Sequence, residues 1–259
     1  MNPATSLPLE EVRAKVSSRS NPARFLYAAV SAVLFVLMLV GFQQFYLHGQ
    51  AYPGHPFPPP IKGLLIAHGT AMTGWMVLFL VQPLLIVSGN RRMHMSLGMI
   101  GAVLAAGIVV LGILTPIATT RVEPDMVLWG FNRKQFMAIP IISILTFGTF
   151  VAIGVWNRRR PEIHRPMMLL ATLSVIAAAT DRITGLPDIY APTIWGRLFG
   201  PFFVALVIGA LFLAVKTALT RSFDRRFAGG FGMLIVVWVF IMKIAPTTAW
   251  DRVASWLTQ

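Results

Sequence analysis

The amino-acid sequence predicts an all-α fold, a polytopic bundle of about seven transmembrane helices with the N-terminus in the cytoplasm. Of the 259 residues, 56% are hydrophobic and only 12% are charged, about half the charged fraction of an ordinary soluble domain. The mean hydropathy is +0.71. Several apolar runs also reach the roughly 20 residues that a membrane-spanning helix needs. These observations exclude a soluble globule, a disordered chain and an ordinary nucleic-acid-binding domain.

The predicted spans follow from seven apolar runs, which cover residues 25–47, 61–88, 95–119, 136–156, 166–184, 198–219 and 230–248. The fifth run is the least regular, because Asp181 and Arg182 interrupt it. A polar tail of residues 1–23 precedes a single transmembrane domain, residues 24–259. The apolar run after this tail is too long for a cleaved signal peptide, so we predict that it is retained as the first span.

The basic residues predict the orientation of the bundle. Fourteen of the 22 Lys and Arg residues fall on the side of the N-terminus and the other eight on the opposite side. The positive-inside rule then places the N-terminus in the cytoplasm and the C-terminus outside. The net charge of +13 is therefore expected to meet anionic membrane lipids, and no nucleic-acid partner is predicted.

Cysteine and several catalytic motifs are absent from the sequence, and their absence limits the kinds of cofactor site and active site that the chain can form. The chain has no Cys, which excludes disulfides, thiolate metal ligands, iron–sulfur clusters and cysteine nucleophiles. The sequence also contains no nucleotide-binding loop, no metalloprotease motif and no paired intramembrane carboxylates. We therefore predict no catalytic residue, and these absences favour a protein that is not an enzyme.

Two predicted cytoplasmic hairpins share a pattern in which an arginine cluster precedes a histidine at the start of a helix. His94 follows the cluster at residues 91–92, and His164 follows the cluster at residues 158–160. If this is a true repeat, a pseudo-two-fold axis along the membrane normal brings both histidines to equal depth. They could then ligate a b-type haem or, with neighbouring methionines, Cu(I). The alternative is a pair of ordinary interfacial histidines among methionines that fill the core.

His68 lies well inside a predicted span, roughly 10 Å below its outer boundary at 1.5 Å per residue. An ionisable side chain in the membrane is a candidate for function. The alternative is a neutral imidazole that is hydrogen-bonded to a neighbouring helix.

Arg182 and Asp181 lie near the outer end of the predicted fifth span. Arg182 is five helical turns after His164, so both would lie on one helix face, roughly 27 Å apart. A guanidinium at this depth, near that of His68, could hold a carboxylate such as a haem propionate, or a quinone-like acceptor, by bidentate hydrogen bonds. The alternative is that Asp181 and Arg182 mark the outer interface and pair with loop groups or lipid phosphates.

The segment between the first two spans contains His48 and His55 and ends with three prolines at residues 58–60. With His68, these histidines could form a three-histidine zinc or copper site, although their spacing matches no standard motif. We expect the proline-rich segment to form a stiff lid over the mouth of the bundle instead.

The motifs around these histidines resemble those of an uncharacterised bacterial family of predicted multi-pass membrane proteins. The family pattern has a helix that opens with histidine and ends in glutamine, here His68 to Gln82. It continues with a His-Arg-x-x-Gly helix start, here residues 94–98, and a His-Arg-x-x-Met helix start with a later arginine, here residues 164–168 and Arg182.

This resemblance covers residues 61–185, and Met95 departs from it by standing where arginine is usual. The bundle is also distantly similar to membrane b-type cytochromes and to oxidase-assembly membrane proteins. The resemblance implies a bacterial inner-membrane protein, with an association with haem or the respiratory chain.

Three functional hypotheses result from these patterns. The first is a protein that binds haem b or a similar redox cofactor through His94 and His164, with His68 and Arg182 in an outer polar pocket. It would serve electron transfer, or act as an accessory or assembly subunit beside partner membrane proteins. The second is a structural or accessory membrane subunit that binds no cofactor, and the absence of a cofactor has the same weight as haem binding. The third and less favoured one is a copper-handling membrane protein.

Overall fold

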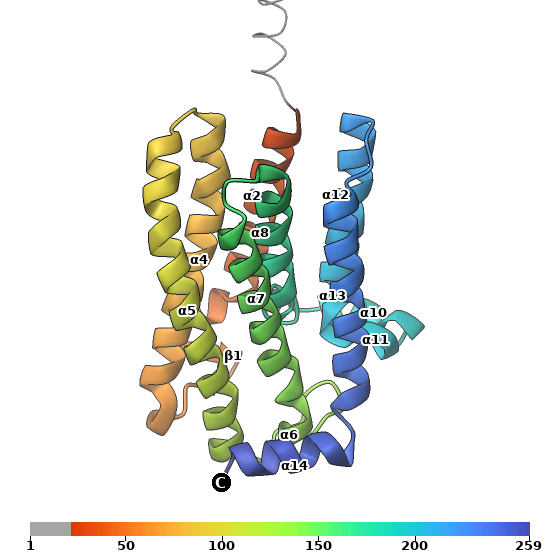
Figure 1. The fold of residues 1–259 in the computed structure, drawn as a ribbon. Coiled ribbons are helices and arrows are strands. Elements are labelled where there is room, and N and C mark those ends of the chain that lie inside the picture. Colours follow the sequence, from red (N-terminus) through yellow and green to blue (C-terminus); the bar gives the residue numbers. More distant parts are fainter. Residues whose placement is uncertain (1–21) are drawn as a thin grey trace, which may run out of the picture.

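The computed structural model describes residues 22–259, which form a bundle of long helices with one small hairpin of strands (Figure 1). The predicted all-α bundle is confirmed. The predicted tail, residues 1–23, lies almost entirely outside the described residues.

The long helices are α2 (Pro22–Gly41), α4 (Lys62–Val87), α5 (Arg91–Val122), α7 (Ala138–Trp156), α8 (Pro161–Val175), α12 (Phe203–Thr220) and α13 (Arg225–Ile244). The shorter elements are α3 (Gln43–His48), α6 (Arg133–Phe136), α9 (Ala177–Thr180), α10 (Leu186–Tyr190), α11 (Ile194–Phe199), α14 (Thr248–Leu257), the 3-10 helices η1 (Pro59–Ile61) and η2 (Gly200–Phe202), and the antiparallel strands β1 (Gln50–Tyr52) and β2 (His55–Pro56).

Six stretches of the described chain are long and apolar enough to cross a membrane, so the protein is a multi-pass membrane protein. They are Pro59–Val87, Arg91–Val122, Arg133–Trp156, Pro161–Thr180, Ile194–Thr220 and Arg225–Ile244. They correspond to the second to seventh predicted spans. The apolar part of α2, Phe25–Gly41, is shorter, and its role as a further crossing stays a prediction.

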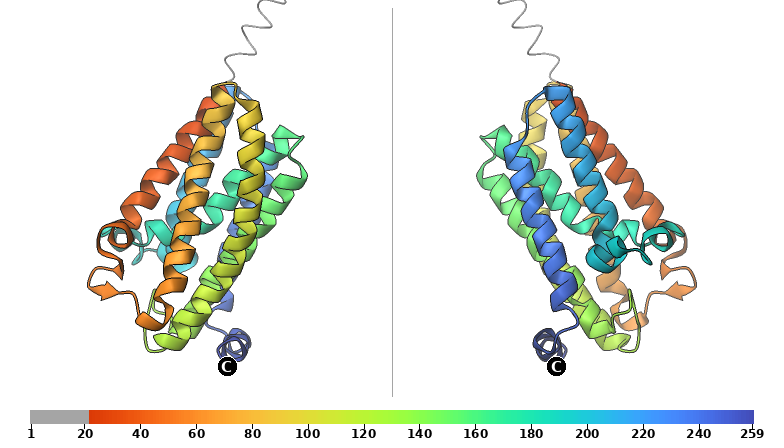
Figure 2. Two further views of the ribbon diagram at one scale, coloured as in Figure 1. Left: turned by 90° about the vertical axis from the view of Figure 1, so that its left-hand side faces the viewer. Right: turned by 90° about the vertical axis from the view of Figure 1, so that its right-hand side faces the viewer.

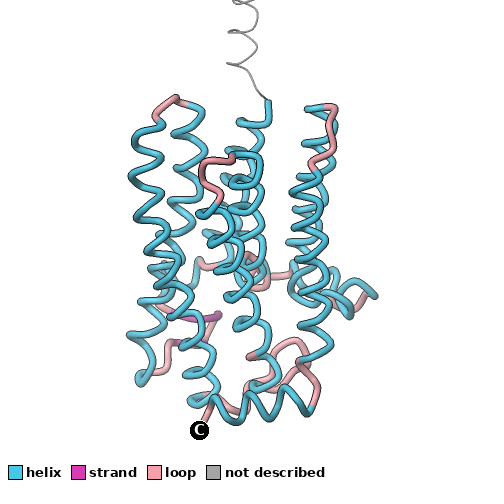
Figure 3. The backbone as a smooth tube through the Cα atoms, viewed as in Figure 1, coloured by secondary structure: helices cyan, strands magenta, loops and turns pink. Residues whose placement is uncertain are grey.

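The long helices are joined into hairpins that all turn at one end of the bundle. The turns of α4–α5, α7–α8 and α12–α13 lie at the end where α2 begins, whereas α6 and α14 lie at the other end (Figures 1 and 3). We call these the hairpin end and the α14 end. The charge count assumed the same division of loops. That the hairpin end faces the cytoplasm remains a prediction.

The α7–α8 hairpin holds the middle of the bundle. Helix α7 contacts α5 on one side, and α8 contacts α13 on the other, while α2 contacts α4, α9 and α12. Large side chains on the outer helices point away from the bundle; for example, Val103 of α5 is 75% exposed and Val236 of α13 is 67% exposed. Because such apolar surface is stable only out of water, these faces fit contact with membrane lipid.

The fifth span ends earlier than predicted. A turn at Ile176 separates α8 from α9, and α9 ends at Thr180. The prediction that Arg182 continues this helix is therefore wrong. Beyond the turn at residues 181–184, Gly185 adopts a positive φ of 79° directly before α10, and Pro187 lies in the first turn of α10, where proline is well tolerated.

The end of the seventh span also differs from the prediction. The chain turns after α13, and α14 lies across the end of the bundle (Figures 1 and 2). Trp250 anchors α14, because its indole Nε1 donates to the carbonyl of Lys134 at 2.9 Å. The Arg121 guanidinium, at the end of α5, donates to the carbonyls of Leu257 and Thr258.

Gly41 allows α2 to meet α9 at backbone distance. A Cβ atom at residue 41 would lie 2.1 Å from the carbonyl oxygen of Ala179 and 2.9 Å from its Cα. Residue 41 must therefore be glycine, because the backbone of Ala179 approaches it too closely for any side chain. This contact brings Phe42, which comes directly after Gly41, close to Arg182, which lies just beyond the end of α9.

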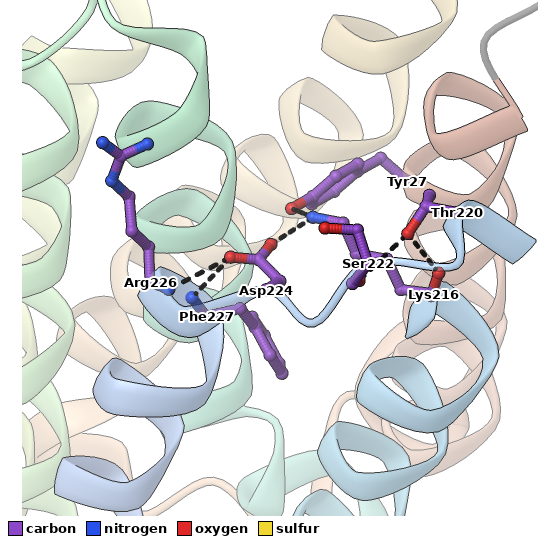
Figure 4. A network of polar contacts seen from close by, with 7 residues as sticks. All are labelled: Tyr27, Lys216, Thr220, Ser222, Asp224, Arg226 and Phe227. Carbon is purple, nitrogen blue, oxygen red and sulfur yellow. Dashed lines mark hydrogen bonds and ion pairs between the residues drawn. The ribbon is translucent and has the colours of Figure 1, made fainter. Parts of the chain in front are cut away.

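A polar network at the hairpin end joins α2, α12 and α13 (Figure 4). Lys216 forms an ion pair with Asp224 and donates to the Tyr27 hydroxyl at 3.0 Å. Asp224 also caps α13, since its carboxylate accepts from the backbone N–H groups of Arg226 and Phe227. The Lys216 and Asp224 side chains are only 14% and 15% exposed, so each charge depends on the other.

We expect the Asp224→Ala substitution to destabilise the protein by about 2–4 kcal/mol, because it removes a helix cap and leaves the Lys216 ammonium buried without its partner. Thermal unfolding of the protein purified in detergent measures the loss. Asp125→Ala is the matched control, since Asp125 is exposed. Equal stability of the two variants would contradict the role assigned to the ion pair.

Candidate functional site

The structure brings His94 and His164 together at the hairpin end. Their ring centres are 6.3 Å apart and their ring planes are inclined by 87°. His94 lies in the first turn of α5 and His164 in the first turn of α8. Both are half-buried, so neither ring simply faces outward. The two arginine-histidine patterns of the sequence thus meet in space.

Each of the two imidazoles makes the same kind of contact with its own hairpin. His94 Nδ1 lies 3.3 Å from the carbonyl oxygen of Gln82, near the end of α4. His164 Nδ1 lies 2.9 Å from the carbonyl oxygen of Gly154, near the end of α7. A ring that donates from Nδ1 to a carbonyl keeps the Nε2 lone pair for another partner, and metal-binding histidines are commonly held in this way.

The methionines near this pair divide into two groups. Met93, Met95 and Met99 are 49%, 65% and 63% exposed, so they point away from the core around the histidines. Met167 is buried and Met168 packs against the α7–α8 core. Three of the five methionines that a Cu(I) site could use are thus exposed, and two pack in the core.

His68 and Arg182 line a cavity of about 270 Å³ nearer the α14 end. Its walls come from α3 to α9, the β1–β2 hairpin and η2. Much of its lining is apolar, with Phe42, Phe45, Phe57, Phe136 and Phe202 as its aromatic members. His94 and His164 are not among the residues that line it. The four predicted site residues therefore belong to two separate places.

The Arg182 guanidinium is held in a fixed plane by its neighbours. Its central carbon lies 4.8 Å from the ring centre of Phe42 and 4.6 Å from that of Tyr52, so it contacts two aromatic faces. Its Nη1 donates to the carbonyl of Ala178 at 2.5 Å. Among residues 22–259, it forms no ion pair, and its Nε is buried without a hydrogen-bond partner.

A second guanidinium, that of Arg133, reaches the same cavity from the start of α6. It forms an ion pair with Glu123 at 3.3 Å, and its side chain is 10% exposed. Its Nε is again buried and unpartnered within the described chain. The same is true of the hydroxyls of Thr115 and Ser143 and of Nδ1 of His68, all of which line the cavity.

Asp181 lies just beyond the fifth span and is turned towards the loop that precedes α6. Its carboxylate accepts a short hydrogen bond from the indole of Trp129. Burial raises the pKa of the Asp181 carboxyl, while this hydrogen bond and the charge of Arg182 act in the opposite direction. Asp181 is thus engaged with Trp129, and it does not form an ion pair with its neighbour Arg182.

The β1–β2 hairpin contributes Gln50, Tyr52 and Pro56 to the wall of the cavity, which matches the position expected for a lid. The predicted three-histidine alternative has no geometric support, because no group of three or more His, Asp or Glu residues in the range 22–259 could hold a metal ion. His48 and His55 are exposed.

The sequence analysis missed several residues of the cavity. Arg133, Glu123, Thr115 and Ser143 line it but were not among the predicted site residues. The available signal was the position of Arg133, since a basic side chain that directly precedes an apolar run is held close to the membrane interior.

Searches of protein-family models, of curated proteins and of solved structures find no match to this chain. The resemblance to a bacterial membrane family and to membrane cytochromes therefore stays a prediction.

Proposed function

We propose that this integral membrane protein binds a b-type haem between His94 and His164 and serves an electron-transfer chain of a bacterial inner membrane. The supporting observation is the 6.3 Å separation of the two ring centres. Two imidazoles that bind one metal from opposite sides, through bonds of about 2.0 Å, have ring centres roughly 6 Å apart. The hydrogen bonds at both Nδ1 atoms leave the two Nε2 atoms as ligands.

The residues around the pair fit this role. Each Nδ1–H···O=C bond fixes the tautomer and the ring orientation, and both carbonyls belong to rigid helices. A bound haem supplies one-electron chemistry. His94 and His164 would hold the haem through their Nε2 atoms. They lie at the hairpin end, the predicted cytoplasmic side, where a soluble or membrane-bound electron carrier would have access.

A second candidate function is a structural or accessory subunit that binds no cofactor. The specific observation in its favour is that both histidines bridge back to the preceding helix of their own hairpin. In this case the imidazoles tie α4 to α5 and α7 to α8, and their ring contact holds the two hairpins together.

The absorption spectrum and the metal content of protein purified from its native membrane test the proposal. We expect a Soret band and about one iron per chain, as a single bis-imidazole haem requires. Protein that carries no iron after purification is mixed with haemin, and a desalting column then removes the haemin that has not bound. A folded protein that shows no Soret band before or after this step would overturn the proposal and favour the structural subunit.

A further inference from the structure

The cavity that contains His68, Arg133 and Arg182 has a chemistry different from that of the histidine pair. Five of its polar atoms are buried without a hydrogen-bond partner within residues 22–259: His68 Nδ1, Thr115 Oγ1, Arg133 Nε, Ser143 Oγ and Arg182 Nε. Such atoms are costly unless something pairs with them. The two guanidinium Nε–H groups can only donate, so the missing partner must be an acceptor.

The two carboxylates of the cavity wall already have partners other than Arg182. The carboxylate of Glu123 pairs with Arg133, and the carboxylate of Asp181 accepts from Trp129. Arg182 has only the π faces of Phe42 and Tyr52 and one backbone carbonyl. The guanidinium of Arg182 thus forms no ion pair within residues 22–259, although the Asp181 carboxyl beside it lies within electrostatic reach. Its buried Nε–H still needs an acceptor, and an anion is the acceptor that forms the strongest hydrogen bonds with a guanidinium.

The geometry of Arg182 favours a carboxylate. Since Nη1 donates to Ala178, the Nε–Nη2 edge of the guanidinium remains, and two parallel N–H groups on one edge match the two oxygens of a carboxylate. The contacts of the guanidinium with the rings of Phe42 and Tyr52 restrict its orientation before any ligand binds. This arrangement reduces the entropy lost on binding.

The apolar wall and the volume of the cavity determine which kind of group can be attached to the carboxylate of the ligand. Aromatic side chains supply much of the wall, and the volume of about 270 Å³ lies at the lower limit for small-molecule sites. We propose that this cavity binds a compact organic acid, with its carboxylate on Arg182 and its apolar or aromatic body among the phenylalanines. Arg133, Ser143 and Thr115 supply further donors. The proposal is independent of haem binding by the histidine pair.

Benzoate is the probe for this site, and benzamide is its uncharged counterpart of the same shape. Isothermal titration of the full-length protein in detergent is expected to show saturable binding of benzoate, with benzamide at least about 10-fold weaker, as expected when a charge-assisted hydrogen bond is replaced by a neutral one. Equal binding of both compounds would overturn the proposal. No benzoate binding at millimolar concentration would also overturn it, and water would then be the occupant.

Two variants locate the site. Arg182→Gln is expected to weaken benzoate binding by about 10- to 100-fold, whereas Arg197→Gln, at an exposed position of α11, should bind like the parent protein. Ser143→Ala is a milder second variant, in case Arg182→Gln does not fold, and it should weaken binding by about 3- to 10-fold. Unchanged affinity in folded Arg182→Gln or in Ser143→Ala would refute the assignment.

Competition separates a compact acid from a membrane fatty acid. Hexadecanoate carries the same carboxylate on a chain too long for the cavity, so it should not displace benzoate. Displacement by hexadecanoate would overturn the compact-acid assignment. His164→Ala should leave benzoate affinity unchanged, so failure of the haem proposal and failure of this one are distinguishable.

Discussion

Alanine in place of His164 is expected to abolish the Soret band of the purified protein. The substitution would remove one of the two nitrogens proposed to hold the haem, and losing even a supporting group around a metal typically lowers metal affinity by about 10- to 100-fold. His94→Ala should have the same effect, because the proposal gives both rings, whose centres are 6.3 Å apart, the same role. Absorption spectra of the folded fraction after gel filtration provide the measurement.

His48→Ala is the matched control for these variants, since His48 is exposed on the short helix α3. His164 can also stabilise the α7–α8 hairpin through its contact with the Gly154 carbonyl. A loss of stability in His164→Ala alone therefore does not show that His164 binds haem. His164→Gly with added imidazole separates the two effects, because free imidazole can restore a ligand but cannot restore a tether. A full Soret band in His94→Ala or His164→Ala would contradict ligation.

Alanine in place of Gly41 is expected to destabilise the bundle by about 3 kcal/mol or more, because its methyl group meets rigid backbone. The new Cβ would lie 2.1 Å from the carbonyl oxygen of Ala179, and neither helix can yield without loss of neighbouring contacts. Equilibrium unfolding in detergent measures this effect. Benzoate binding should weaken as well, since Phe42 would shift away from Arg182.

Gly107→Ala is the matched control for this substitution. Gly107 is also a helical glycine, in α5, and a Cβ there meets nothing within 4 Å. Alanine should therefore stabilise the helix at residue 107 by about 0.5–1 kcal/mol. If both alanine variants changed stability in the same direction and by a similar amount, close packing of α2 on α9 would be refuted.

The sequence predicted most of the helices of the bundle, because membrane spans are set by apolar length alone. Six of the seven predicted spans coincide with helices that are long and apolar enough to cross. The breaks after α2 and within the fifth span were not predicted. They depend on tertiary contacts, such as that of Gly41 with Ala179, which leave no mark on local hydropathy. The direction of α14 depends in the same way on the Trp250 and Arg121 hydrogen bonds.

The candidate sites were predictable to different degrees. The repeated arginine-histidine pattern correctly indicated that His94 and His164 would meet, because equivalent positions in two hairpins reach equal depth. His68 and Arg182 were placed near one another for a partly wrong reason, since Arg182 lies beyond the helix that was thought to carry it. Arg133 reaches the cavity only through the fold of the 123–133 loop, which residue spacing cannot reveal.

The early end of α9 has a consequence for biogenesis. After Thr180 the chain runs through α10 and α11 beside α13, part-way along that helix (Figure 1). Peptide groups in short irregular pieces at this depth cannot be exposed to acyl chains, so they must be covered by other protein segments. The contact of α11 with α13 supplies part of this cover for residues 181–202. We expect them to fold only after the C-terminal hairpin has been inserted, so that truncation before α13 would leave this segment open to membrane-quality-control proteases.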